Sequence, residues 1–262
     1  MKRKKTPGYV NRMRTRRAVG RGILKCVEIA LCLGIVGGFG YKFLQYAEGS
    51  TDFLVRKVEI RGLDHLNEYD VLRASGISDR ENILFFDSDA VEAQVQDMSY
   101  VFDCDVELRF PDTAILHIEE RQPEATLMLN SHSFEIDREG VVLRRYDPHE
   151  MPLLPFLTSE TDLEFAEVGD TIKNPGLVEA LRLWRLFARS PMAERLTVSE
   201  LAVLHTDDIR MYCDELSFEL RWGRGRFEEQ ITRLSALWDT LDGLIDCQQY
   251  LDLRFDADLV CK

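Results

Sequence analysis

Alternating hydrophobic and polar residues mark several strands in this 262-residue chain. In VRKVEIRG, Val58 and Ile60 share one face of an extended run that Gly62 ends. In FDCDVELRFPDTAILHIEER, two alternating runs flank a Pro-Asp turn. Alternation with a period of two residues is typical of a strand with one buried face. The pattern therefore predicts a strand near residue 58 and a hairpin across residues 102–120.

Two short stretches with helical spacing lie between these strands. The stretch NEYDVLRAS begins with Asn67 and is followed by Gly76. Asn and Gly are preferred at the two ends of a helix, so a short helix is expected here. A second helix is expected from Ser88 or Asp89 to Met98. The resulting order is β-α-α-β-β, which predicts a small three-stranded sheet that carries two helices.

The remainder of the chain, residues 122–262, reads as a mixed β-domain with a mostly antiparallel sheet and two flanking helices. Its expected elements are a hairpin across 134–143, an extended stretch over 151–158, a helix opened by Asn174 and Pro175, strands near 201–205, 209–213 and 216–222, and a helix over 227–241. With the first part, this gives an α+β fold class.

The C-terminal stretch QYLDLRF also alternates, although chain ends usually fray. The pattern predicts that Leu251, Leu253 and Phe255 pack against the helix over 227–241, and that the residues between them point outward, namely Tyr250, Asp252 and Arg254. If this strand is the last in its sheet, its unpaired backbone groups can receive a strand from a partner. The alternative is a strand that is paired on both sides and merely solvated.

An apolar segment, residues 23–46, follows the N-terminal arm. As a helix it is roughly 35 Å long, which is enough for a hydrocarbon core of about 30 Å. Ten Lys and Arg residues and no acidic residue lie within positions 1–25, so the N-terminus is expected on the cytoplasmic side. The prediction is a retained signal anchor. A cleaved signal peptide, cut near Ala47-Glu48-Gly49, is the weaker alternative.

The body beyond the anchor is acidic. From Ala47 onward the chain has 22 basic and 45 acidic residues. Phosphate contacts need a basic face, so this composition argues against nucleic-acid binding by the body.

Four cysteines lie beyond the anchor, at Cys104, Cys213, Cys247 and Cys261. Their wide spacing excludes a small disulfide scaffold, but one or two bridges remain possible in an oxidising compartment. Cys247 and Cys261 are the pair expected to be near neighbours. None of the five histidines shows the spacing of a metal-ligand pair, so neither a metal nor another cofactor is expected.

No motif in the chain predicts catalysis. Glu119 and Glu120 point to opposite faces of a strand and are expected to be solvated or ion-paired, as is the pair Asp207-Asp208. The GRGR run at 223–226 is best explained as a strand-to-helix turn rather than a phosphate cradle. We therefore expect neither enzymatic activity nor a small-molecule substrate.

Three motifs resemble those of the bacterial cell division family FtsQ/DivIB. They are the strand ending in Gly62 with its helix, the NILFFD stretch before the second helix, and RFPDTAILHIEERQPEA over 109–125. The segment YLDLRF is similar to a Tyr-x-Asp-Leu-Arg-Tyr stretch of that family. The resemblance implies a basic cytoplasmic arm over 1–22, an anchor over 23–46, a POTRA domain over 53–121 and a β-domain over 122–262.

The same resemblance implies a divisome scaffold in the inner membrane at the septum. Its body would lie in the periplasm and bind the FtsB–FtsL complex through the C-terminal strand, helping to control septal peptidoglycan synthesis. The residues implied are Tyr250, Leu251, Asp252, Leu253, Arg254 and Phe255. A different POTRA protein, acting as a chaperone-like module in outer-membrane assembly, is the alternative.

Overall fold

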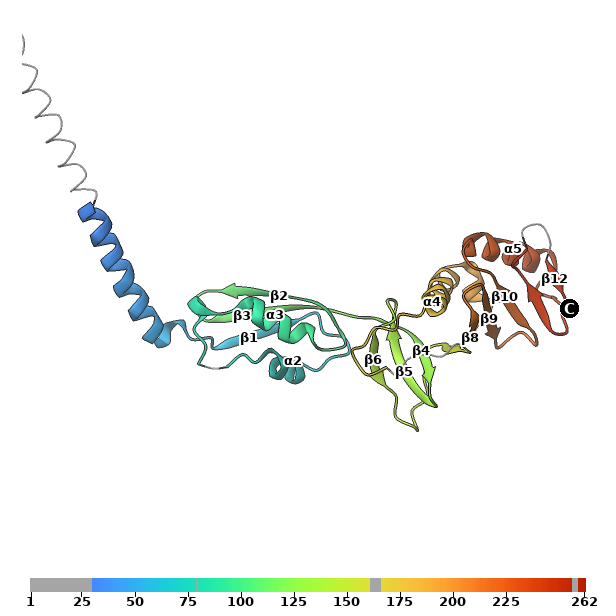
Figure 1. The fold of residues 1–262 in the computed structure, drawn as a ribbon, viewed down its shortest axis with the longest axis horizontal. Helices are drawn as coiled ribbons and strands as arrows, with labels where there is room; N and C mark the ends of the chain where they lie inside the picture. Colours follow the sequence, from blue (N-terminus) through green and yellow to red (C-terminus); the bar gives the residue numbers. More distant parts are fainter. Residues whose placement is uncertain (1–29, 79, 161–165, 256–258) are drawn as a thin grey trace, which may run out of the picture. The chain divides into compact units, whose positions relative to one another are not determined.

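The computed structural model describes residues 30–78, 80–160, 166–255 and 259–262 (Figure 1). The chain divides into two compact units. The first includes the described residues up to Glu59 together with Ser78–Asp87 and Leu108–Ile115, and the second includes Ile60–Ile77, Ser88–Glu107 and Leu116–Lys262.

The described N-terminal segment is helical over residues 30–49. Its apolar side chains are largely exposed, with Phe39 and Val36 at 75% and 69% of their full accessibility. Among the residues that the structure describes, no helix combines the length and hydropathy required of a membrane span. The anchor predicted over 23–46 begins in residues 1–29, and the basic arm lies wholly there, outside the described residues.

A three-stranded sheet and two helices follow the order predicted from the sequence, β-α-α-β-β. The elements are β1 (Lys57–Arg61), α2 (Glu68–Ser75), α3 (Ser88–Gln96), β2 (Val101–Arg109) and β3 (Thr113–Glu120), with 3₁₀ turns at η1 (Thr51–Phe53) and η2 (Ile83–Phe85). The sheet order is β1-β3-β2. The side chain of Asn67 caps α2 by accepting the Tyr69 N–H at 2.9 Å, and Gly76 ends it in the left-handed conformation, as predicted.

Gly62 explains why β1 ends where it does. Its φ of +90° lies in the left-handed region, and a Cβ at this position would lie 2.0 Å from the carbonyl oxygen of Ile118. Only glycine can therefore occupy this close approach to β3 without moving the backbone.

The rest of the chain forms a mixed sheet of nine strands, in the order β12-β11-β10-β9-β8-β7-β4-β5-β6. The strands are β4 (Pro123–Leu129), β5 (His132–Asp137), β6 (Val142–Arg145), β7 (Phe156–Ser159), β8 (Val198–His205), β9 (Asp208–Cys213), β10 (Glu219–Trp222), β11 (Tyr250–Asp252) and β12 (Val260–Cys261). Three pairs are parallel, β4 with β7, β7 with β8, and β10 with β11; the other neighbours are antiparallel.

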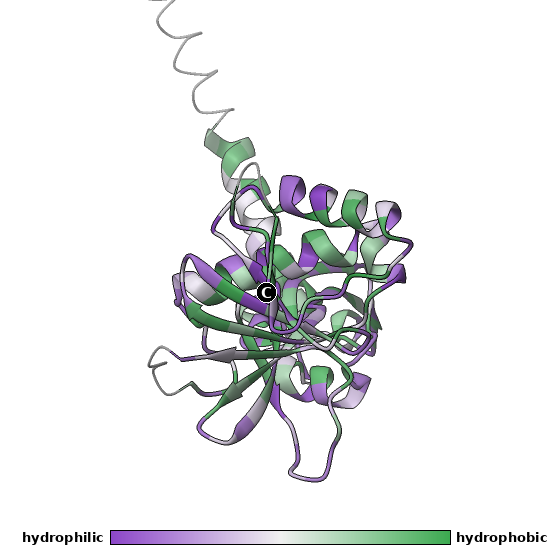
Figure 2. Ribbon diagram, turned by 90° about the vertical axis from the view of Figure 1, so that its right-hand side faces the viewer, coloured by the Kyte–Doolittle hydropathy of each residue, from purple (hydrophilic) through white to green (hydrophobic). Residues whose placement is uncertain are grey.

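Two long helices pack on this sheet and share its core. They are α4 (Pro175–Ala188), capped by the Asn174 side chain as the sequence predicts, and α5 (Phe227–Thr240), with the short η3 (Pro191–Glu194) after α4. Seen from the end that carries the C-terminus, hydrophobic and hydrophilic segments alternate along the strands and helices (Figure 2). The largest fully buried side chain is that of Trp222, which meets the ring of Phe187 from α4 edge-on.

Strand β4 is not among the elements expected from the sequence. Its central residues Ala125, Thr126 and Leu127 are all buried, so the strand lacks the alternation that reveals one with a solvated face. A strand buried on both faces reads as a short apolar run instead. The hydroxyl of Thr126 is accommodated there by donating to the carbonyl oxygen of Leu154 at 3.3 Å.

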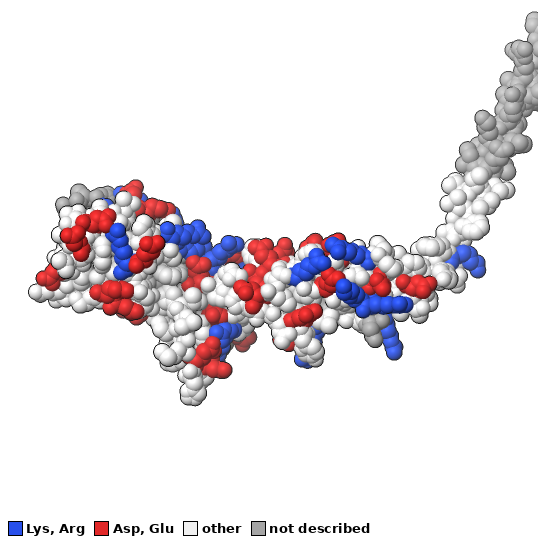
Figure 3. Space-filling model, turned by 180° about the vertical axis from the view of Figure 1, so that it is seen from behind, with Lys and Arg blue, Asp and Glu red and all other residues white. Residues whose placement is uncertain are grey.

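The charged side chains do not segregate by sign on the face shown in Figure 3, where acidic and basic groups are interspersed. This distribution agrees with the sequence argument against a basic nucleic-acid face in the body.

Candidate partner-binding edge

Strand β11 is not the edge of its sheet, contrary to one of the two readings of the sequence. Tyr250 and Leu251 pair in parallel with Glu219 and Leu220 of β10. On its other side, β11 pairs antiparallel with β12. The last strand of the sheet is therefore β12, formed by Val260 and Cys261.

The backbone of β12 is joined to β11 through the last residue of the chain. The Lys262 N–H donates to the Tyr250 carbonyl oxygen at 3.1 Å, and the Lys262 carbonyl oxygen accepts the N–H groups of Gln249 and Tyr250 at 2.6 and 3.3 Å. Successive residues of an antiparallel strand point their backbone groups in opposite directions. The N–H and C=O of Cys261 therefore point away from β11, toward the outside of the sheet.

The structure places the six predicted binding residues in three burial classes: buried, half-buried and exposed. Leu251 and Leu253 are buried in the core that also contains Ile231 and Leu234 of α5, as the alternation predicts. Tyr250 and Arg254 are half-buried. Phe255, predicted to be in the core, is 52% exposed, and Asp252, predicted to point outward, is 3% exposed. Both expectations were wrong. Phe255 lies beyond β11, which ends at Asp252, so the strand alternation does not continue to it. Asp252 lies inside β11 but is flanked by β10 and β12, and Arg254 binds its carboxylate.

The buried carboxylate of Asp252 is held by Arg254. It accepts the Arg254 backbone N–H at 3.0 Å and the guanidinium Nη2 at 2.6 Å. Burial by itself raises the pKa of Asp252, but the hydrogen bonds and charge of Arg254 outweigh it and hold this pKa below its ordinary value. The guanidinium also lies 3.8 Å from Asp208, so the exposed side of this turn is closed by an ion pair.

Arg233 of α5 fixes the chain that follows β11. Its guanidinium donates to the carbonyl oxygen of Leu253 at 2.8 Å and also to that of Phe255. Tyr250 is held on the opposite side of the strand, where the guanidinium of Arg221 stacks 3.7 Å from the centre of its ring. Side chains from the sheet and from α5 thus set the path of the backbone on both sides of Asp252.

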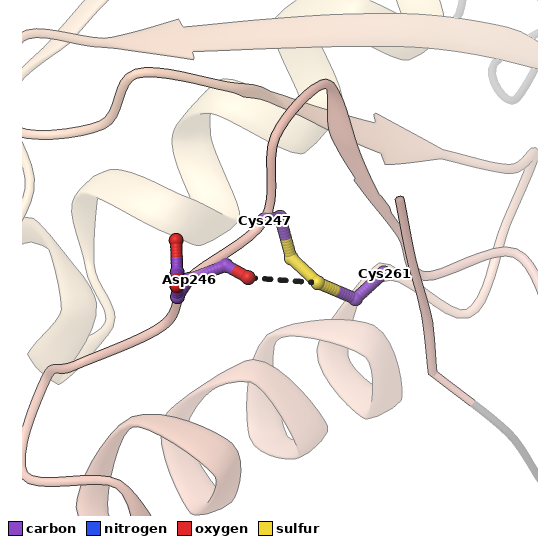
Figure 4. The surroundings of a disulfide bond; sticks show 3 residues. All are labelled: Asp246, Cys247 and Cys261. Carbon is purple, nitrogen blue, oxygen red and sulfur yellow. Dashed lines mark hydrogen bonds between the residues drawn. A yellow bond between two sulfur atoms is a disulfide. The ribbon is translucent and has the colours of Figure 1, made fainter.

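A disulfide joins Cys261 of the edge strand to Cys247, with a Cα–Cα distance of 5.4 Å (Figure 4). The sequence prediction that these two cysteines are near neighbours is confirmed. Cys247 is 3% exposed and belongs to the core, whereas Cys261 is exposed. The Cys261 sulfur also lies 3.5 Å from the backbone carbonyl oxygen of Asp246.

Several exposed apolar side chains lie on the segments around this edge. Leu244, before β11, is 80% exposed; Phe255 and Val260 lie after β11 and on β12. The sequence pattern does not identify β12 or Leu244, because a two-residue strand and a lone leucine have no periodicity. The one signal that pointed to β12 was the pair of cysteines.

The acidic pairs do not converge on a reaction centre. Glu119 is exposed, while Glu120 is buried and accepts the backbone N–H groups of Asp64, His65 and Leu66 at 2.9, 2.7 and 3.0 Å. Glu120 is therefore buried rather than solvated, with backbone amides as its main partners. The ion-paired alternative has a partner in His65, whose Nδ1 lies 3.1 Å from the carboxylate. Among the described residues, no group of three or more His, Cys, Asp or Glu side chains is placed to hold a metal ion.

Comparison with known proteins gives two family matches. Residues 53–121 match the POTRA domain, FtsQ-type, and residues 125–254 match the model of cell division protein FtsQ/DivIB, C-terminal. The first of these regions includes the three-stranded sheet and its helices, and the second runs from the third residue of β4 to the turn after β11.

The chain is also similar to proteins named cell division protein FtsQ. The chain is 27% identical to cell division protein FtsQ of Anaeromyxobacter sp. (strain K) over 87% of this chain and 76% of the relative. It is 21% identical to FtsQ of Geotalea daltonii over 92% of this chain and 89% of the relative. A solved structure of the major extracytoplasmic domain of the cell division protein DivIB from Geobacillus stearothermophilus aligns with 49% of this chain and 99% of that chain, at 18% identity and a TM-score of 0.31.

Proposed function

Because the chain belongs to the FtsQ/DivIB family of cell division proteins, we propose that it is a non-enzymatic, membrane-anchored scaffold of the bacterial divisome. In this role it links early and late division proteins by binding the FtsB–FtsL complex and helps control septal peptidoglycan synthesis. The alternative, a chaperone module in outer-membrane protein assembly, is not favoured, because both matching family models describe FtsQ-type domains.

The proposed topology has the N-terminal arm in the cytoplasm, a single pass through the inner membrane and the body in the periplasm. The exposed apolar side chains of the helix over 30–49 support the proposal, because such a surface is stable in lipid rather than in water. The Cys247–Cys261 disulfide also supports it, since disulfides persist in oxidising compartments such as the periplasm.

The observation that carries the partner proposal is the position of β12 at the end of the nine-stranded sheet. A strand that pairs with an edge obtains affinity from backbone hydrogen bonds and selectivity from the side chains beside it. We propose that an FtsB strand pairs with β12, where the backbone groups of Cys261 point outward.

The six residues from Tyr250 to Phe255 then have different roles in this interface. Leu251 and Leu253 hold β11 on the core, and the Asp252–Arg254 pair fixes the turn that follows. Tyr250, Arg254 and Phe255 retain exposed surface and are the side chains proposed to contact the partner. The interface extends beyond these six residues to Leu244 and Val260.

Binding of the full-length chain, in nanodiscs, to the purified FtsB–FtsL complex tests this proposal. Phe255→Glu places a charge on the exposed apolar surface and is expected to weaken binding at least about tenfold, the effect of roughly 1.4 kcal/mol. Leu153→Glu is the matched control, because Leu153 is 99% exposed and lies in the segment before β7, not beside β12. If the two variants bind the complex with equal affinity, this edge is not part of the binding site.

Depletion of the protein in its source bacterium tests the broader role. Filamentous cells without complete septa are expected, and the wild-type chain should restore division while Phe255→Glu should not. Normal division with defects confined to the outer membrane would contradict a divisome role.

A further inference from the structure

The edge strand β12 buries few side chains against the sheet. It consists of two residues, and the side chains of Val260, Cys261 and Lys262 are all exposed. Within residues 259–262, the described part of this segment, Leu259 is the residue that packs half-buried against the core. Short segments with few buried contacts open readily, because ordering them costs conformational entropy that burial does not offset.

The disulfide supplies the attachment that burial does not. It connects exposed Cys261 to Cys247, which is 3% exposed and part of the core that contains Leu251 and Leu253. The two cysteines are 14 positions apart, so the bond closes a loop that contains all of β11 and returns β12 beside it. Figure 4 shows this bridge between the segment that precedes β11 and the terminal strand.

The backbone hydrogen bonds of Lys262 follow from the same attachment. They join Lys262 to Gln249 and Tyr250, which lie two and three positions after Cys247, while Lys262 lies one position after Cys261. The covalent bond thus brings together the same two backbone segments that form the β11–β12 ladder. Without it, only the backbone hydrogen bonds and the half-buried Leu259 join β12 to β11 among the described residues.

We propose that the Cys247–Cys261 disulfide is a positioning element of the partner-binding edge, so that capture of a partner strand requires the oxidised protein. This inference rests on the proposed function, in which an incoming strand pairs with β12. Reduction would leave the core of the domain folded and release its last strand, removing the surface with which the partner pairs.

The other cysteines of the body are not placed to replace either partner. Cys104 and Cys213 are buried, and burial raises the pKa of Cys104 to about 11 and that of Cys213 to about 12. Both thiols are therefore protonated at neutral pH, and a protonated thiol is a poor nucleophile in disulfide exchange. Cys32 is exposed on the helix over 30–49, so the test needs a control for its modification.

The chemical step is a two-electron exchange with a dithiol. One thiolate of the dithiol attacks the accessible sulfur of Cys261 and displaces Cys247 as a thiolate. The second thiolate of the dithiol then attacks the reagent sulfur that is bonded to Cys261. This step releases Cys261 as a thiolate and forms the cyclic disulfide of the oxidised reagent. The two protons of the dithiol end on the two cysteines.

The test measures the affinity of the full-length chain in nanodiscs for the FtsB–FtsL complex, with and without dithiothreitol. Reduction and the double variant Cys247→Ser/Cys261→Ser are each expected to weaken binding at least about tenfold, because the apparent dissociation constant rises as the fraction with an ordered edge falls. Dithiothreitol should not change the affinity of the double variant further, which controls for Cys32. Equal affinity of the oxidised and reduced wild-type protein would overturn the inference and leave the proposed function standing.

Amide hydrogen exchange of the same samples separates this inference from the proposed function. On reduction, the amides of Gln249, Tyr250 and Lys262 are expected to lose protection while those of β8 and β9 keep it. Unchanged protection at these three amides would show that the disulfide does not position β12. If the oxidised wild-type chain fails to bind the complex, the proposed function fails, and the exchange result still decides whether the disulfide holds the edge.

Discussion

The two edge strands of the nine-stranded sheet, β6 and β12, differ in whether another backbone segment pairs with them. At the β6 end, residues 169–172 run beside the strand: the Val142 N–H donates to the Asp170 carbonyl oxygen at 2.9 Å, and the Gly169 N–H donates to the Val142 carbonyl oxygen at 2.8 Å. At the other end, β12 follows β11 and no further strand follows it among the described residues.

A buried hydrogen-bond network is centred on Glu135 of β5, the strand that pairs with β6. Its carboxylate accepts the hydroxyl of Tyr100, the hydroxyl of Tyr146 at 2.9 Å and the Nε of Arg144 at 2.9 Å. At the β12 end, the smaller Asp252–Arg254 ion pair and one disulfide stabilise the structure instead.

The difference shows how a protein can protect one sheet edge and use the other. An edge covered by the chain's own backbone cannot pair with another strand, whereas an uncovered edge remains available for one. We therefore expect changes at the β6 end to affect stability alone, and changes at the β12 end to affect stability less and partner binding more.

The largest expected effect on stability is that of Glu135→Ala. This change leaves two hydroxyls and a guanidinium without their shared acceptor and should lower the free energy of unfolding by about 3 kcal/mol. Urea denaturation of the full-length chain in detergent micelles measures it. Glu150→Ala, which removes the exposed partner of Arg144, should leave the midpoint unchanged. Similar midpoints for both variants would contradict the importance of the buried network.

A smaller loss is expected for Asp252→Ala at the opposite end. It removes the carboxylate between the Arg254 backbone and guanidinium and should cost about 2 kcal/mol, since Asp208 remains near the guanidinium. Asp252→Asn keeps an acceptor for the Arg254 N–H and should lose less. Thermal unfolding followed by circular dichroism gives the ranking, and an order in which Asn is the worse substitution would argue against the hydrogen-bond account.

The pH dependence of this pair gives a still smaller effect. The pKa of Asp252 is held below its ordinary value of 3.8, so the stabilisation is present above that value and is lost as pH falls through the folded pKa. The gap in unfolding midpoint between wild type and Asp252→Ala should therefore be full at neutral pH and shrink as the pH falls below 3.8. A gap that stays constant over this range would mean that ionisation of Asp252 does not stabilise the turn.

The smallest stability effect is expected at Leu244, on the segment before the open edge. Because its side chain is 80% exposed, Leu244→Ser should change the free energy of unfolding by less than about 0.5 kcal/mol. It should nevertheless weaken capture of the FtsB–FtsL complex several-fold. Met151→Ser, at a residue 86% exposed in the segment after β6, should change neither quantity. If both variants lose binding, partner binding is not specific to the β12 end of the sheet.

Much of the fold follows from local sequence. Asn67 and Gly76 set the ends of α2, Asn174 and Pro175 begin α4, and alternation across the Pro-Asp turn reveals the β2–β3 hairpin. These signals are readable because caps and period-two patterning act over a few residues. The β-α-α-β-β order and the mainly antiparallel β-domain were predicted from them.

Other elements have no such local signal. Strand β4 is buried along its centre and so does not alternate, and its parallel neighbour β7 is separated from it by more than twenty residues of chain. The burial of Glu120 depends on three backbone amides of the segment over 64–66, which are distant in sequence. Neither feature can be predicted from the pattern of the residues themselves.

At the C-terminus the sequence by itself determined that Leu251 and Leu253 face the core and that Cys247 and Cys261 lie near each other. Only the tertiary structure decided that β11 is paired on both sides, that β12 is the edge, and that Asp252 is buried while Phe255 is exposed. Periodicity gives the faces of a strand, because side chains alternate along it. Which strand ends the sheet depends instead on hydrogen bonds between segments whose pairing the alternation does not specify.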